Sequence, residues 1–307
     1  MAKATTDRDE VLLDYPVTTP GGTHLPDLPS YHWILVNSSA GKDSQAMLDY
    51  VVELCDRYGV PRSRIVVVHC DLGFAEWEGT LELAQEQAEH YGLRFVVVKR
   101  DGTVFQGKVL GDLFDQVIER RASLLAKGKP EVSPWPSLKN RWCTSDQKTS
   151  QVAKLMTALK DEAKANGVRG KVRILNCLGL RADESDERAQ KPEFVLEKKP
   201  SNTLKDVHRW LPIKHWDEEQ VWDRIWASGV RWHWAYDKGM ERLSCCFCVL
   251  ASPKDWEISL KYNRKVAERI AEVEGIVGHA IKEPQKGAPI RMSDILAAAD
   301  RAALVSA

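Results

Sequence analysis

Short apolar runs alternate with helix-like segments between residues 33 and 98, and this alternation restricts the possible folds more than any other feature. The apolar runs, each short enough for a buried strand, are 33–36, 65–68 and 95–98. Between them, apolar residues recur at helical spacing over 47–55 and 77–91, and Gly59 and Gly92 close these two segments. Such an alternation predicts a parallel sheet with right-handed crossovers.

The rest of the chain adds further elements to this pattern. We expect helices at 109–126 and 146–165, a strand at 172–175, a strand at 210–213 that leads into a helix, and helical runs at 253–274 and 292–304. The prediction is an α/β domain over 31–230, with a parallel sheet flanked by helices. An irregular N-terminal arm at 1–30 precedes it, and a cysteine-containing, mainly helical region at 231–307 follows.

Composition excludes some classes of function. Lys and Arg number 44, and so do Asp and Glu, so the net charge is zero and no general attraction to nucleic acid is expected. The sequence has no window of roughly 18 apolar residues and no apolar leader, so we expect a cytoplasmic protein with no membrane partner. In that compartment the 7 cysteines are better interpreted as thiols or metal ligands than as disulfides.

The turn after the first strand has the features of an anion site. A strand–turn–helix junction directs free backbone N–H groups at one point, on the positive end of the helix dipole. Gly41 allows close approach of a phosphate, Lys42 adds a charge, and Ser39 and Ser44 offer hydroxyl groups. Asp43 is suited to orienting Mg²⁺ or capping the helix. The turn is not a Walker A loop, because the required earlier glycine is missing and Asp43 follows the lysine.

Two later segments are candidates for the same site. Asp71 follows the second strand, and ligands of open α/β sheets bind beyond the carboxyl ends of strands. Arg181, Asp183, Glu184 and Arg188 follow the strand at 172–175. The arginines are suited to phosphate or sulfate oxygens, and Asp183 or Glu184 to Mg²⁺. A helix-capping role for Asp71 and a solvated surface loop at 181–188 are the structural alternatives.

Four cysteines form a candidate metal site. Cys245 and Cys248 have the C-x-x-C spacing that lets two thiolates bind one metal centre, and a third ligand from a distant loop would close such a site, for which the resemblance described below implies Cys143. Cys246 is a fourth ligand, a persulfide carrier or a spectator. An iron–sulfur cluster, a structural Zn²⁺ with His233 nearby, a redox dithiol and plain buried cysteines all remain open. Core packing is expected for the other three, Cys55, Cys70 and Cys177.

Several of these motifs resemble one superfamily. The sequence S-x-G-K-D-S at 39–44 resembles the PP-loop signature of ATP pyrophosphatases and phosphoadenosine-phosphosulfate (PAPS) reductases. Residues 178–188 resemble the Gly-x-Arg-x-x-Glu-Ser-x-x-Arg segment of that family. R-W-C-T around Cys143 and S-C-x-x-C at 244–248 resemble cysteine motifs of PAPS-reductase-like phage and DNA-sulfur-modification proteins. The resemblance covers about 31–252 and is greatest to the DNA phosphorothioation (Dnd/Ssp-type) ATP pyrophosphatases.

The resemblance implies a Rossmann-like, adenine nucleotide alpha hydrolase-like fold over 31–230 that cleaves ATP, with Mg²⁺, between the α and β phosphates. AMP would activate an acceptor, and sulfur would then displace the adenylate. It implies catalytic roles for Lys42, Asp43 and Arg181 and ATP or Mg²⁺ contacts from Ser39, Gly41, Lys42, Asp43, Ser44, Asp71, Arg181, Glu184 and Arg188. It also implies a [4Fe-4S] cluster, with Zn²⁺ as the alternative, on Cys143, Cys245 and Cys248, with Cys246 as a further candidate.

Other members of the superfamily provide the competing functions. A PAPS or adenylylsulfate reductase would need a C-terminal cysteine nucleophile, and no cysteine follows Cys248. A tRNA thiolation enzyme and a metal-stapled nucleotide sensor or scaffold in a sulfur-transfer assembly are the remaining alternatives. The expected partners are ATP, a DNA acceptor reached directly or through a partner protein, a cysteine desulfurase as sulfur donor, and other proteins of the modification system.

Overall fold

The computed structural model describes residues 25–100, 103–105, 108–282 and 289–306. The chain divides into two compact units. The first, which we call the sheet unit, comprises Met1–His69, Glu82–Val96 and Ala153–Trp232, and the second, the helical unit, comprises Cys70–Leu81, Val97–Val152 and His233–Ala307. Most of the predicted arm at 1–30 lies outside the described residues, and Leu28–Ser30 forms a short 3-10 turn.

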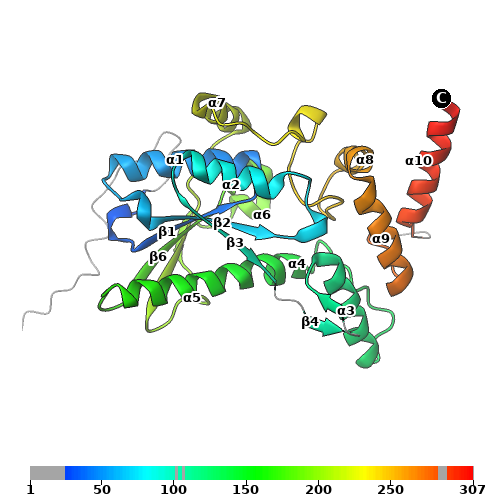
Figure 1. The fold of residues 1–307 in the computed structure, drawn as a ribbon, viewed down its shortest axis with the longest axis horizontal. Coiled ribbons are helices and arrows are strands. Elements are labelled where there is room, and N and C mark those ends of the chain that lie inside the picture. The colour runs from blue at the N-terminus through cyan, green and yellow to red at the C-terminus, as the bar shows by residue number, and fades with distance from the viewer. Residues whose placement is uncertain (1–24, 101–102, 106–107, 283–288, 307) are drawn as a thin grey trace, which may run out of the picture. The chain divides into compact units, whose positions relative to one another are not determined.

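A six-stranded sheet organises the fold, in the order β3-β2-β1-β6-β8-β7 (Figure 1). The strands are β1 Trp33–Ser38, β2 Ile65–Asp71, β3 Arg94–Lys99, β6 Val172–Cys177, β7 Phe194–Leu196 and β8 Lys205–Trp210. β1 pairs in parallel with β2 and β6, and β6 pairs in parallel with β8. The predicted α/β class is therefore confirmed. The sheet is nevertheless not wholly parallel, because β7 runs antiparallel to β8 at one edge.

Helices cover both faces of the sheet. Figure 1 shows α1 (Lys42–Arg57) and α2 (Thr80–His90) on one face and α5 (Ser150–Ala165) on the other. The short α6 (Asp186–Ala189) follows β6, and α7 (Glu218–Ser228) packs on α1. The core of this unit joins both kinds of element, because fully buried side chains of β1 and β2 pack with the apolar face of α1, including Ile34, Val36, Ile65, Val67, Met47 and Val51. This burial fixes the start of α1 at the end of β1.

The helical unit has its own apolar core. Its elements are the hairpin β4 Thr103–Phe105 and β5 Lys108–Leu110, and the helices α3 Leu113–Ala126, α4 Trp142–Thr144, α8 Pro253–Tyr262, α9 Arg264–Val277 and α10 Met292–Ser306. A five-residue π-helix, Ser145–Thr149, joins α4 to α5. The buried cluster combines α3 and α9 with the tryptophans Trp77, Trp135 and Trp142. None of the helices in the described ranges combines the length and apolar character that a membrane span requires.

Several predicted helix boundaries were wrong, each for a local reason. The second helix begins at Thr80 rather than at 77, because Gly79 has a positive φ of 82° that helical backbone does not allow. The helix expected at 109–126 begins only at Leu113, where the Asp112 carboxylate caps the Asp115 amide at 2.8 Å. Residues 108–110 form a strand instead.

Three more predictions were wrong in detail. The first turn of the helix predicted at 146–165 is π-helical, so α5 starts at Ser150. The single run predicted at 253–274 is two helices, because Asn263, with φ −128° and ψ 45°, interrupts the helical backbone. The strand predicted at 210–213 ends at Trp210 and begins at Lys205, where charged and apolar residues mix and obscure the strand pattern.

Candidate functional site

The Ser44 hydroxyl group stabilises the turn between β1 and α1 through two hydrogen bonds. Ser44 donates to the Gly41 carbonyl at 2.9 Å and accepts from the Ser39 amide at 3.2 Å. Ala40 adopts a positive φ of 55°, which turns the chain sharply between the strand and the helix. Gly41 is the N-cap and has no side chain that could satisfy the first amides of α1. The sequence prediction placed these residues correctly at a strand–helix junction.

Lys42 lies in the first turn of α1 and is buried. Its residue is only 4% exposed, and its Nζ lies 3.2 Å from Oε1 of Glu218, in the first turn of α7. A buried ammonium group requires compensating negative charge. Glu218 supplies part of that charge, a role that no motif in the sequence indicated.

Arg181 connects the loop after β6 to the first turn of α1. Its Nε donates to Oδ1 of Asp43 at 2.6 Å, and its Nη1 donates to Oδ2 of Asp183 at 2.5 Å and to the Trp216 carbonyl at 3.3 Å. The guanidinium is almost completely buried, so these contacts fix its orientation. Two of the residues predicted for the nucleotide site, Asp43 and Arg181, are therefore in contact.

The remaining charges of this loop form a second ion pair. Glu184 accepts a hydrogen bond from the Arg181 amide at 3.1 Å and pairs with the Arg188 guanidinium. Ser185 caps the short α6 by accepting from the Arg188 amide at 3.3 Å. The loop is thus ordered by its own side chains rather than being a freely solvated run of charges.

Gly179 brings this loop into direct contact with α1. A Cβ atom at this position would lie 2.9 Å from the Asp43 carbonyl oxygen and 3.1 Å from the Ser44 amide nitrogen. Both atoms belong to backbone, which cannot move aside without displacing the helix start. Packing at this position therefore excludes any residue larger than glycine. The sequence alone does not show this close approach of the loop to α1.

Asp71 is the last residue of β2 and belongs to the helical unit. Its carboxylate accepts from the Gly73 amide at 2.6 Å and from Lys99 Nζ at 2.9 Å. The hydrogen bond to Gly73 is a local capping contact of the kind considered as its structural role. A contact between Asp71 and a nucleotide stays a prediction.

Three of the four predicted metal-site cysteines interact in the helical unit. The Cys245 thiol hydrogen bonds to the Cys248 sulfur, which lowers the pKa of Cys248 to about 6 and raises that of Cys245. Burial raises the pKa of Cys143, and the charge on Cys248 raises it further. The ammonium of Lys148, five residues after Cys143, acts in the lowering direction on the pKa of all three thiols, although the pKa of Cys143 and of Cys245 stays raised.

Cys246 differs from these three. It is 3% exposed within the apolar core of the helical unit, and its amide donates to the Ala75 carbonyl at 2.8 Å. Burial raises the pKa of its thiol, as it does for Cys55 and Cys177, which the structure confirms as core residues of the sheet unit. The expectation for Cys70 was wrong, because it is partly exposed at the end of β2 and interacts with Lys148.

No group of three or more His, Cys, Asp or Glu side chains is arranged to hold a metal ion in the ranges that the structure describes. The histidine considered as a zinc ligand, His233, uses its ring nitrogens elsewhere. Nε2 lies 3.2 Å from Thr80 Oγ1, and Nδ1 accepts from the Ala235 amide at 3.1 Å. A zinc site that includes His233 would require one of these two contacts to be given up, because an imidazole binds zinc through one nitrogen.

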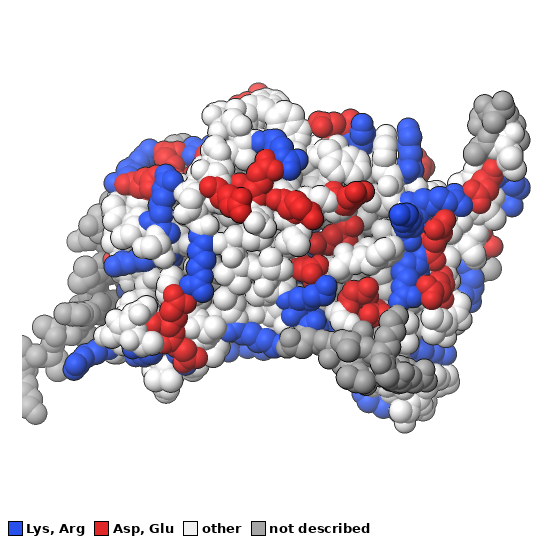
Figure 2. Space-filling view, viewed as in Figure 1, with Lys and Arg blue, Asp and Glu red and all other residues white. Residues whose placement is uncertain are grey.

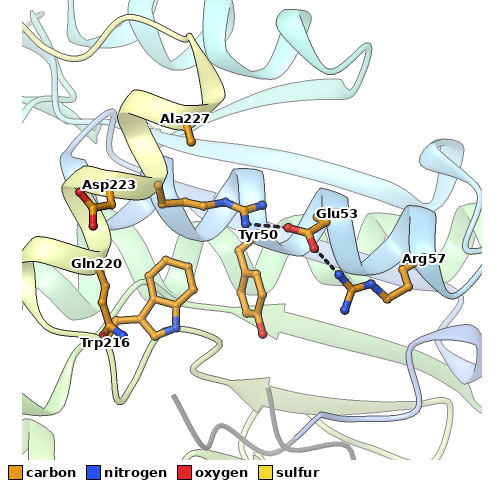
Figure 3. Close-up of a pocket in the computed structure, with 8 residues that line it drawn as sticks. Tyr50, Glu53, Arg57, Trp216, Gln220, Asp223 and Ala227 are labelled. Carbon is orange, nitrogen blue, oxygen red and sulfur yellow. Dashed lines mark hydrogen bonds and ion pairs between the residues drawn. The ribbon is translucent and has the colours of Figure 1, made fainter. Parts of the chain in front are cut away.

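A pocket of about 350 Å³ lies between α1 and α7 (Figure 3). Tyr50 and Trp216 form its aromatic wall, with ring centroids 5.0 Å apart. Arg224 of α7 pairs with Asp49 and, at 2.6 Å, with Glu53 of α1, so the two helices are clamped together. The pocket does not include the loop at 39–44, although the Trp216 carbonyl contacts Arg181.

Comparison with known proteins agrees with this arrangement of strands and loops. Residues 33–251 match the phosphoadenosine phosphosulfate reductase domain family. The chain belongs to this family. An uncharacterised protein of Escherichia phage 186 is 28% identical over 79% of this chain and 75% of its own length. An uncharacterised protein of Methanocaldococcus jannaschii is 23% identical over 77% of this chain, which spans only 42% of that protein.

Two solved structures are among those that this chain resembles. A PAPS reductase from Candida auris in complex with phosphate superposes with a TM-score of 0.44 at 15% identity, covering 71% of this chain and 84% of the reductase. The U34-tRNA thiolase of Methanococcus maripaludis with its [4Fe-4S] cluster gives a TM-score of 0.40 at 16% identity, covering 85% and 78%. The DNA phosphorothioation branch expected from the sequence stays a prediction.

Proposed function

We propose that this member of the PAPS reductase domain family is an ATP pyrophosphatase. It hydrolyses ATP to AMP and pyrophosphate and thereby activates an acceptor for sulfur insertion. The observation that carries the proposal is the pairing of cations with carboxylates at the start of α1 and in the loop after β6. The cations are Lys42, Arg181 and Arg188, and the carboxylates are Asp43, Asp183, Glu184 and Glu218.

This balance of charge favours a nucleotide that arrives with a metal ion. A bare polyphosphate would meet four carboxylates against three cations, whereas Mg²⁺ that arrives with the nucleotide would supply the missing positive charge. Asp43 is the best-placed carboxylate for the metal, because it is in the first turn of α1 and is already oriented by Arg181.

We assign each group of the site a separate role in the reaction. The first amides of α1 and Lys42 bind the β and γ phosphates, and Ser39 and Ser44 shape the turn. Arg181 neutralises charge on the α phosphate, and Mg²⁺ held by Asp43 would supply further positive charge there. Water attacks the α phosphorus, the bond from this phosphorus to the bridging oxygen breaks, and pyrophosphate leaves with that oxygen and its electrons. With an acceptor present, an acceptor oxygen replaces water and carries AMP until sulfur displaces it.

The products of ATP turnover test this proposal. With Mg²⁺ and purified protein, we expect AMP and pyrophosphate in equal amounts, measured by chromatography and a coupled pyrophosphate assay. ADP and phosphate as the products would contradict α–β cleavage. ATP binding without turnover would instead identify a nucleotide sensor. PAPS offered with a thiol reductant should release no sulfite.

The DNA backbone is the acceptor that we propose, as in phosphorothioate modification. On the face in Figure 2, Lys and Arg side chains are interspersed with Asp and Glu side chains. With a net charge of zero, a broad basic surface for duplex DNA is not expected. The proposal therefore includes a partner protein that presents the DNA, and a cysteine desulfurase that supplies the sulfur.

We further propose that Cys143, Cys245 and Cys248 hold a metal centre. Three interacting thiols, one of them favoured as thiolate, provide the soft donors that a [4Fe-4S] cluster or Zn²⁺ requires. A cluster bound there would supply an iron site for sulfur, and Lys148 would offset the negative charge of the ligands. Cys246 packs in the core and is left out of this ligand set.

Metal content tests the ligand set directly. Protein purified without oxygen should contain iron with acid-labile sulfide, or else zinc, and Cys143→Ser should lose most of it because one of three ligands is gone. Cys55→Ser is the control, since Cys55 is buried in the core of the sheet unit, whereas the three cysteines of the site belong to the helical unit. Elemental analysis and the visible absorption spectrum provide the measurement. Full metal retention in Cys143→Ser would remove Cys143 from the site.

A further inference from the structure

The contact between Glu218 and Lys42 bears on the release of pyrophosphate rather than on the binding of ATP. We propose that Glu218 returns to Lys42 after ATP cleavage and in this way helps to expel pyrophosphate, an inference that rests on the proposed function. Glu218 does not touch the reacting atoms in this scheme. It acts through Lys42 and is a positioning residue.

The burial of the two partners differs, and the difference makes the contact reversible. The Lys42 side chain is 5% exposed, whereas the Glu218 side chain, whose Oε1 lies 3.2 Å from Lys42 Nζ, is 58% exposed. The lysine is therefore fixed at the start of α1, and the glutamate can rotate into water at little cost. When a polyphosphate reaches Lys42, it brings negative charge next to Glu218, and the carboxylate leaves.

Because Glu218 is tethered to the protein, it competes with any anion bound at Lys42. A tethered group acts at a high effective concentration, and it does not diffuse away when displaced. ATP has further contacts through its nucleoside and outcompetes the carboxylate. Pyrophosphate is no longer joined to the nucleoside once the α–β bond is broken, so it lacks those further contacts. Competition from Glu218 therefore lowers the affinity for pyrophosphate more than the affinity for ATP.

The body of α7 does not need to move for this exchange. Arg224 pairs with Asp49 and Glu53 of α1 and clamps α7 one to two turns beyond Glu218. Figure 3 shows Glu53 of α1 on the side that faces α7, and Trp216 and Gln220 at the end of α7 where the helix begins. Asp217 caps that end by accepting from the Gln220 amide at 2.8 Å. The exchange is therefore confined to one side chain.

Binding of pyrophosphate itself provides the test. Titration calorimetry with sodium pyrophosphate, with and without Mg²⁺, needs no turnover and separates this inference from the proposed reaction. We expect Glu218→Gln to bind pyrophosphate about three- to tenfold more tightly than the unmodified protein, because the competing charge is removed. Glu218→Asp, which keeps the charge, should stay near the unmodified protein.

The neighbouring residue offers a matched control. Glu219→Gln removes the same charge from the same first turn of α7, and no contact with Lys42 is recorded for Glu219 in the described residues. Its pyrophosphate affinity should change less than about twofold. In steady-state kinetics, Glu218→Gln should lower both KM for ATP and kcat and strengthen product inhibition, whereas a merely destabilised helix would not tighten binding.

The outcomes separate cleanly. Three results would each overturn the role of Glu218. They are equal pyrophosphate affinity in Glu218→Gln and Glu219→Gln, weaker binding in Glu218→Gln than in the unmodified protein, and no binding by Glu218→Gln or the unmodified protein. Failure of the unmodified protein to form AMP and pyrophosphate from ATP would overturn the proposed function. Tighter pyrophosphate binding in Glu218→Gln alone would then still establish the competition at Lys42.

Discussion

Replacing Lys42 with alanine is expected to reduce pyrophosphate release from ATP by about 100-fold or more. Loss of one preorganised positive group that meets developing negative charge typically costs a factor of this size. The measurement is the rate of pyrophosphate formation at saturating ATP and Mg²⁺, together with the ATP dissociation constant.

Lys199→Ala is the matched control for this substitution. Lys199 is an exposed lysine of the sheet unit that lies in the turn between β7 and β8. Its removal should leave turnover unchanged within about twofold, because an exposed charge in a high-dielectric environment acts weakly. If Lys42→Ala retained a third or more of the activity, the loop at 39–44 would not be the phosphate site.

The second large effect is expected from the smallest possible change, Gly179→Ala. The added methyl group would lie 2.9 Å from the Asp43 carbonyl oxygen, so either the loop after β6 or the first turn of α1 must shift. Overpacking of this kind costs about 1–3 kcal/mol. We also expect ATP turnover to fall by about tenfold or more, because the same shift disturbs the contact of Arg181 with Asp43.

Gly275→Ala separates this packing effect from a general effect of losing a glycine. Gly275 lies within α9, and a Cβ atom there would meet nothing within 4 Å. Alanine is the better helix former, so this variant should be as stable as the unmodified protein or more stable by up to about 1 kcal/mol. Thermal melting and ATP turnover of both variants give the comparison. Equal behaviour would show that Gly179 is not required at the helix start.

The fold was largely predictable because its signal is local. The runs 33–36, 65–68 and 95–98 are apolar throughout, as strands buried on both faces must be, and the helices between them show their period plainly. β7 and β8 were missed or displaced since β7 has only three residues and β8 mixes charged with apolar side chains. The helix ends depended on Gly79, Asp112 and Asn263, and the hydrophobic periodicity of the sequence does not indicate their roles in the backbone.

The candidate site was predictable only in part. The turn at 39–44 could be recognised because a phosphate cradle needs a glycine, a lysine and hydroxyl groups at fixed short spacing. Arg181 was singled out by its motif, yet its contact with Asp43 joins residues 138 positions apart. Glu218 and Gly179 were not assigned roles, because each acts through a neighbour that is distant in the chain.

The sequence by itself determined the α/β alternation, the strand–turn–helix junction at 39–44 and the C-x-x-C spacing of Cys245 and Cys248. These features depend on backbone geometry over a few residues, which local spacing records directly. The tertiary structure alone decided which carboxylate neutralises Lys42, why Gly179 has no side chain, and that Cys246 is buried within an apolar core against which the partly exposed Cys143 packs. Those outcomes depend on contacts between segments that are far apart in the sequence, and such contacts produce no periodic pattern of residues.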